Sequence, residues 1–168
     1  MVSRLNLTPR GRRPLPACAA AAWAFLFAIP SFYWAAGGSI GEDTIAADIE
    51  QALGALGEPW FVALTGVAKV IVGLLLLALV LVPLDNTPRR TLTLGVGLIG
   101  VGMIAYAVAN FLQHGLMLFD AIDTPDSLGR SALHWHFFFW DPWWLLGGVL
   151  FIVAARSARR AKPARAGE

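Results

Sequence analysis

The chain has 168 residues, of which 57% are hydrophobic and only 14% are charged, whereas about a quarter of the residues in soluble proteins are charged. The formal net charge is +2 and the charges give no nucleic-acid-binding footprint. A single cysteine, Cys18, excludes an intramolecular disulfide and a Cys-x-x-Cys redox or zinc site. This composition indicates an integral membrane protein whose main partner is the lipid bilayer.

The first apolar segment covers residues 17–36 and follows a tail, residues 1–14, that holds four arginines and no acid. About 20 residues are enough to cross the hydrocarbon core of a bilayer as a helix. Pro30 removes one backbone donor inside the segment, so we expect a kinked span. A basic start and small residues at 35–37 also fit a cleaved signal peptide. The length of the segment favours a retained span.

The connection after this segment, residues 39–59, contains five acidic residues and no basic residue. Its apolar residues recur at helical spacing: Ile45, Ile49, Ala52, Leu53 and Leu56. The pattern predicts a short amphipathic helix, which either lies on the outer membrane surface or packs over the mouth of the bundle. The acidic outer loops are also where a protein partner is expected to bind, if there is one.

Three further apolar segments follow the acidic connection. They cover residues 60–82, 92–118 and 134–155. The turn between the first two of these is short, so both segments are expected to be antiparallel neighbours. The sequence therefore predicts one all-α domain over residues 1–168, a membrane-spanning four-helix bundle with a short amphipathic helix in its first outer loop.

The distribution of charge predicts the orientation of the bundle. Eleven of the thirteen Lys and Arg residues lie in the tail 1–14, the middle turn 83–90 and the tail 156–168. The two alternate loops are acidic, and of the remaining basic residues only Arg130 lies in them, while Lys69 is intramembrane. The positive-inside rule places the basic segments in the cytoplasm. We expect a multi-pass protein of the cell membrane with both termini cytoplasmic.

Glycines in the third span match a nucleotide-binding motif without its structural context. Gly95-Val-Gly-Leu-Ile-Gly100 has the letters of the dinucleotide fingerprint, but that motif needs a preceding strand. Within a membrane helix, small residues instead let a neighbour approach closely. Gly95 and Gly102 recur seven residues apart, as do Gly66 and Gly73 in the second span. We expect the second and third spans to pack through these faces.

Lys69 is the charge that most needs an explanation, because a charge inside the hydrocarbon costs about 2.5–3.5 kcal/mol on insertion scales. Counted at about 1.5 Å per residue from the cytoplasmic ends, Lys69 lies roughly 21 Å up and Asp141 roughly 22 Å up. The two opposite charges therefore come out at the same depth. We predict an intramembrane ion pair between Lys69 and Asp141.

Further polar residues accompany this pair. Tyr106, Asn110, Gln113 and His114 share one face of the third span. Tyr33 and Ser31 of the first span could complete a pocket with them, although Tyr33 could equally anchor the interface. The candidate polar pocket consists of Lys69, Tyr106, Asn110, Asp141 and Tyr33. Polar residues also hydrogen-bond membrane helices together without binding a ligand, and this structural role is the favoured alternative.

The segment 134–144 contains four tryptophans, three phenylalanines, two histidines and one acid. Such aromatic residues are typical of a membrane interface. Asp141 and Pro142 fit the start of a helix, but a helix from residue 142 to 155 would measure only about 21 Å. The segment before it must then contribute, either as a first half-helix or as a re-entrant turn broken at Asp141.

Three histidines raise the question of a metal or haem. His134 and His136 are two residues apart and point to different sides of a helix, so they would share a ligand only if the backbone were extended. His114 and His136 are the better pair, one from each of two helices. Interfacial histidines without a ligand are nevertheless commoner, and we expect no metal and no cofactor. The chain shows no carboxylate pair, Ser/His/Asp set or phosphate loop elsewhere.

Three short stretches carry a resemblance to a known family: Ser-Phe-Tyr-Trp-Ala-Ala-Gly-Gly at 31–38, Arg89-Arg90 in the turn, and Trp140-Asp-Pro-Trp-Trp-Leu-Leu-Gly-Gly148. With them the whole chain resembles a family of small bacterial four-span membrane proteins, domain of unknown function 3995. The resemblance implies a location in the bacterial inner membrane. It supplies no activity and no functional residue.

Three functional hypotheses follow from the sequence. The favoured one is an accessory, structural or interaction role, for which enzymatic activity is not expected but stays open. The second is a small transporter or ligand-binding membrane protein that uses Lys69, Asn110 and Asp141 in a polar pocket. The third is a haem- or metal-binding membrane enzyme subunit that uses His114 and His136.

Overall fold

The computed structural model describes residues 14–41, 44, 59–82, 84–125 and 128–160. These residues are helical apart from short connections, and they contain no strand. The helices are α1 (Leu15–Ala35), α3 (Pro59–Leu81), α4 (Asn86–Leu118), α5 (Gly129–Trp135), the π-helix η3 (His136–Trp140) and α6 (Asp141–Arg160). The amphipathic helix expected between residues 45 and 56 falls outside the described residues.

Four helical stretches are long and apolar enough to cross a membrane. They are Leu15–Ala35, Pro59–Leu81, Asn86–Leu118 and Gly129–Arg160, the last formed by α5, η3 and α6 in succession. The prediction of an all-α four-helix membrane bundle is confirmed for the described part of the chain, and the protein is a multi-pass membrane protein. The first two helices match the predicted spans within two residues, whereas α4 begins six residues earlier and the fourth stretch extends five residues further at each end. Apolar residues mark the hydrocarbon region, and polar turns can continue a helix beyond it.

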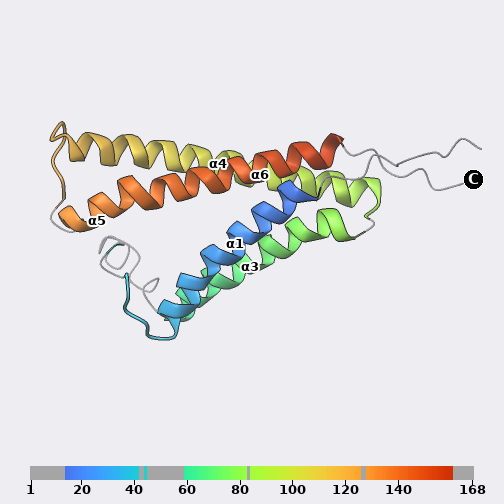
Figure 1. The fold of residues 1–168 in the computed structure, drawn as a ribbon, viewed down its shortest axis with the longest axis horizontal. Helices are drawn as coiled ribbons and strands as arrows, with labels where there is room; N and C mark the ends of the chain where they lie inside the picture. The colour runs from blue at the N-terminus through green and yellow to red at the C-terminus, as the bar shows by residue number, and fades with distance from the viewer. Residues whose placement is uncertain (1–13, 42–43, 45–58, 83, 126–127, 161–168) are drawn as a thin grey trace, which may run out of the picture.

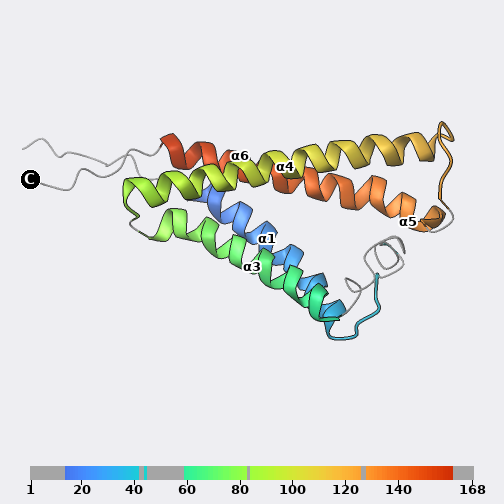
Figure 2. The ribbon, with the colours of Figure 1, turned by 180° about the vertical axis from the view of Figure 1, so that it is seen from behind.

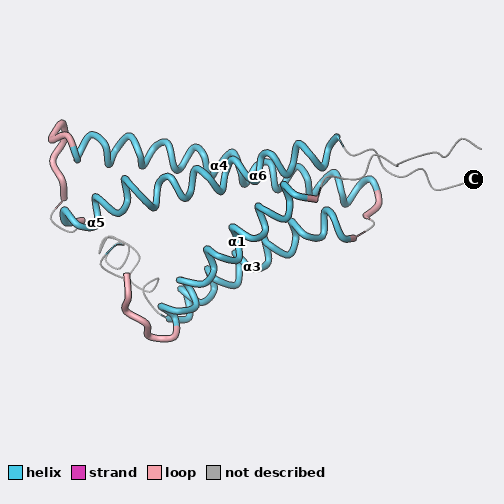
Figure 3. Tube along the Cα trace, in the orientation of Figure 1, coloured by secondary structure: helices cyan, strands magenta, loops and turns pink. Residues whose placement is uncertain are grey.

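The four helices form two antiparallel pairs that together make a V (Figure 1). In one arm α1 packs along α3, and in the other α4 packs along α6. The arms meet at the closed end, which holds the start of α1, residues 82 and 84–85, and the end of α6. They diverge towards the open end, which holds residues 36–41 and 119–125 (Figure 2). The helices run continuously between loops at these two ends (Figure 3).

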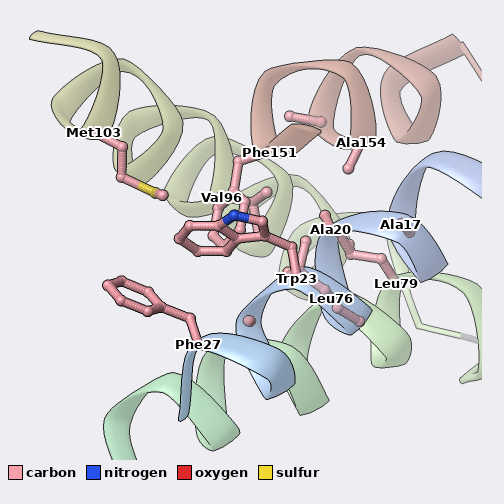
Figure 4. Close-up of a cluster of buried hydrophobic side chains, with 13 residues drawn as sticks. Ala17, Ala20, Trp23, Phe27, Leu76, Leu79, Val96, Met103, Phe151 and Ala154 are labelled. Carbon is pink, nitrogen blue, oxygen red and sulfur yellow. The ribbon is translucent and has the colours of Figure 1, made fainter. Parts of the chain in front are cut away.

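An aromatic and aliphatic core joins the two arms. Trp23 of α1 is 5% exposed, and its ring centroid lies 5.1 Å from that of Phe27 and 6.0 Å from that of Phe151 on α6. Leu76 of α3 and Met103 of α4 pack into the same cluster (Figure 4). All four membrane helices thus contribute to one core, which fixes the arms against each other where they meet.

The predicted packing of α3 on α4 through their glycines is wrong. Gly66 and Gly73 of α3 face Phe32 and Phe25 of α1. A Cβ added at Gly95 or Gly102 would meet nothing within 4 Å.

The close approach of α4 uses Gly100 instead, which lies against Gly148 of α6. Seven-residue spacing identified smooth helix faces, but spacing does not say which neighbour a face meets. Each glycine of α3 that was expected to face α4 packs within its own arm.

The segment before Asp141 is a continuous helix and contains neither a half-helix break nor a re-entrant turn. Its π-helical turn ends where the backbone N–H of Asp141 donates to the carbonyl of His136, five residues earlier. Pro142 has no N–H to donate, which removes one hydrogen bond of the regular α pattern at this point. A π-helical turn accommodates the lost donor and keeps the chain helical through the whole span.

Candidate ligand-binding cavity

A cavity of about 250 Å³ lies between the two arms. Its walls come from α1, α3, α4, η3 and α6, so both arms are needed to form it. The lining residues are Phe27, Ser31, Trp34, Phe61, Val62, Thr65, Lys69, Tyr106, His136, Trp140, Asp141 and Trp144.

Aromatic rings form most of the wall. The ring of Trp144 lies 5.0 Å from Phe27 and 5.2 Å from Tyr106 between centroids, and Trp140 lies 6.3 Å from Trp34. Aromatic pairs at such separations hold each other in place and bury large apolar areas. Part of the aromatic segment 134–144 therefore faces into the protein, which the prediction of an interfacial belt did not anticipate.

Lys69 supplies a positive charge to this apolar wall. Its Nζ donates a hydrogen bond to Ser31 Oγ at 2.7 Å and lies 4.0 Å from the centroid of the Phe27 ring. An ammonium group has three N–H donors. One hydroxyl acceptor and one aromatic face thus leave part of its hydrogen-bonding capacity available to the cavity.

The predicted ion pair between Lys69 and Asp141 is not formed. Among the described residues no carboxylate lies within ion-pairing distance of Lys69, and Asp141 Oδ2 instead lies 2.7 Å from His114 Nδ1. The helical rise gave a common depth for the two residues, and both line the same cavity. Depth alone could not place them side by side, because the two residues belong to different arms and the cavity lies between the arms.

Three potential metal ligands meet where α4, η3 and α6 pack together. His114, His136 and Asp141 each offer one ligand atom, and these atoms lie within 4.8 Å of one another. The imidazole rings of His114 and His136 are 4.9 Å apart between centroids. Asp141 is 2% exposed, and its hydrogen bond to His114 joins α6 to α4.

The π-helical turn explains why two of these residues share one wall. His136 and Asp141 are five residues apart, and in an α-helix such residues point about 140° away from each other. The i to i+5 pattern of a π-helix turns them towards the same side. Sequence reasoning missed this arrangement, although Pro142 directly after Asp141 was a visible sign of irregular helix.

Two predicted pocket residues lie elsewhere. Tyr33 does not line the cavity: its hydroxyl accepts a hydrogen bond from the backbone N–H of Ile40 at 3.3 Å and closes the turn after α1. Asn110 is half-buried on α4 and is also not part of the cavity wall. Lys69, Tyr106 and Asp141 are the members of the predicted set that the structure brings around the cavity.

Comparison with known proteins places the chain in a family. No curated protein and no solved structure matches it. A family profile described as Protein of unknown function (DUF3995) matches residues 24–151, from the core region of α1 to the middle of α6. The match includes every residue that lines the cavity. The chain therefore belongs to the DUF3995 family of proteins of unknown function.

Proposed function

We propose that this membrane protein binds a small, largely apolar acid in the cavity between its two arms, as a transporter or receptor for that molecule. One observation carries the proposal: the ammonium group of Lys69 lines an aromatic cavity and has no carboxylate partner among the described residues. A charge at membrane depth is expensive and is typically functional. An acidic group on a bound molecule would pair with Lys69.

The shape and chemistry of the cavity support this class of ligand. Its volume of about 250 Å³ is just below the usual range of roughly 300–1,000 Å³ for small-molecule sites, which favours a compact molecule. Aromatic walls suit an apolar or aromatic body, and Lys69 fixes the end at which an acidic group would bind. Asp141 is turned to His114, so it does not neutralise Lys69.

Charge supports an orientation for the protein in the cell membrane. At the closed end lie Arg89, Arg90, Arg156, Arg159 and Arg160. The positive-inside rule would place this end and both termini in the cytoplasm. The cavity lies nearer the open end, and in this orientation it would belong to the outer half of the bilayer.

The test compares an acid with its uncharged analogue. Purified protein in detergent is titrated with 2-naphthoate and with 2-naphthalenemethanol, and binding is followed by quenching of tryptophan fluorescence and by thermal stabilisation. We expect tighter binding of the acid, and we expect Lys69→Met to remove this preference. Arg130→Gln, a change outside the cavity wall, should leave it intact.

The accessory role is the alternative outcome. If acid and alcohol bind alike, or if Lys69→Met leaves the preference unchanged, the charge does not select a ligand. Lys69 would then serve to connect helices, through its hydrogen bond to Ser31.

A further inference from the structure

We propose that His114, His136 and Asp141 bind a divalent transition metal ion, with Zn²⁺ as the best match, in the cavity wall formed by α4, η3 and α6. This site lies on the arm opposite Lys69 and goes beyond the binding of an organic acid. It assigns a ligand to residues that the proposed function leaves without a role.

The three donors have the right chemistry and are close enough to share one ion. Two imidazoles and one carboxylate form a common ligand set for Zn²⁺ and for Fe²⁺. Bonds of about 2.0–2.2 Å to the metal place donor atoms up to roughly 4 Å apart, and here they lie within 4.8 Å of one another. Side-chain rotations would have to close the remaining gap.

His136 provides an independent indication. Its Nε2 is buried and has no hydrogen-bond partner in the described part of the chain. Leaving a buried polar atom unpaired costs about 1–3 kcal/mol, and such atoms are rare. A metal ion bound to this nitrogen removes the cost.

The hydrogen bond between His114 and Asp141 does not account for the whole cluster. It pairs two of the residues at 2.7 Å, but it leaves His136 unexplained. The π-helical turn, which Pro142 favours, brings His136 to the side of Asp141. Helical segments of this kind are frequent at functional sites.

The arrangement leaves room beside the ion. His136 and Asp141 line the cavity, so an ion held by three protein ligands would keep a coordination position open towards it. Zinc sites with three protein ligands typically bind water or a ligand at the fourth position. Haem does not suit this place, because a cavity of about 250 Å³ is smaller than the usual site for a drug-sized molecule.

The test uses Co²⁺ as a coloured substitute for Zn²⁺. Full-length protein without a polyhistidine tag is purified in detergent, stripped with a chelator and titrated with Co²⁺. We expect one Co²⁺ per chain, with visible absorption that disappears when Zn²⁺ is added. His136→Ala should weaken binding by at least about tenfold.

His134→Ala is the matched control, because His134 is exposed and its Nδ1 is hydrogen-bonded to the carbonyl of Arg130. This variant should bind Co²⁺ like the wild type. His136→Gln serves as the second variant if the alanine variant does not fold. Equal Co²⁺ binding by wild type and a folded His136 variant, or no stoichiometric binding by wild type, would overturn the proposal.

The metal-binding proposal and the acid-binding proposal can be refuted independently of each other. Lys69→Met should abolish the preference for 2-naphthoate and leave the Co²⁺ spectrum unchanged. Loss of the acid preference alone therefore says nothing against the metal site.

Discussion

Replacing Gly148 by alanine should push α4 and α6 apart. A Cβ at this position would lie 2.6 Å from Ile104 Cγ1, 2.9 Å from the carbonyl oxygen of Gly100 and 3.0 Å from the backbone nitrogen of Ile104. The isoleucine side chain can rotate away, but a backbone atom within a helix cannot move without moving the helix. The two helices must therefore separate, and overpacking of this kind costs about 1–3 kcal/mol.

The matched control for this change is Gly102→Ala, also in a membrane helix. A Cβ at Gly102 would meet nothing within 4 Å. Both substitutions gain the same helix propensity, about 1 kcal/mol, so the difference between them isolates the packing cost. We expect Gly148→Ala to be less stable than Gly102→Ala by about 1–3 kcal/mol.

Unfolding in mixed micelles with increasing sodium dodecyl sulfate, followed by circular dichroism, measures this difference. Two variants of equal stability, within about 0.5 kcal/mol as expected for sites without such features, would refute the contact between α4 and α6. A less stable Gly102→Ala variant would instead favour the packing of α3 on α4 that the sequence suggested.

Two further predictions concern the orientation and the π-helical turn. The orientation is tested with single cysteines in a Cys18→Ser background. Ile40→Cys, which is exposed at the open end, should react with an impermeant maleimide on intact cells, whereas Arg159→Cys should react only after lysis. The reverse pattern would contradict the proposed orientation. Pro142→Ala restores a backbone N–H donor and should favour a regular α-helix in place of the π-helical turn. His136 would then turn away from Asp141, so we expect weaker Co²⁺ binding. Unchanged Co²⁺ affinity would show that the π-helical turn does not position the metal ligands.

Hydrophobic runs were enough to predict the number of membrane helices, because the bilayer imposes both their length and their composition. The ends of the helices were harder to predict. α4 begins at Asn86, within a polar stretch that a search for hydrophobic segments does not include in the span. The arrangement of the helices was not predictable in the same way. Gly66 faces α1 rather than α4, and spacing along one helix contains no information about which partner it meets.

Only part of the candidate site was predictable, because the sequence gives the depth of a residue along its helix but not the neighbouring helix that it faces. Helical rise identified Lys69 and Asp141 as residues of one depth, and both line the cavity. The partner of Asp141 is His114, which depends on the pairing of α4 with α6. The orientation of His136 depends on a π-helical turn, and a count based on 3.6 residues per turn misplaces residues beyond it.

Ligand binding between the two arms requires that Lys69 faces a cavity that small molecules can enter. Lys69→Cys in a Cys18→Ser background tests this claim directly, with the rate of reaction with a small methanethiosulfonate reagent as the measurement. Leu76→Cys, at a fully buried core position, and Ile40→Cys, at a position 80% exposed, are the slow and fast references.

We predict that the Lys69→Cys thiol reacts well above the Leu76→Cys rate and is protected when 2-naphthalenemethanol fills the cavity. This neutral probe does not need the charge of Lys69. A rate as slow as that of Leu76→Cys would contradict the account and would make Lys69 part of a closed helix contact.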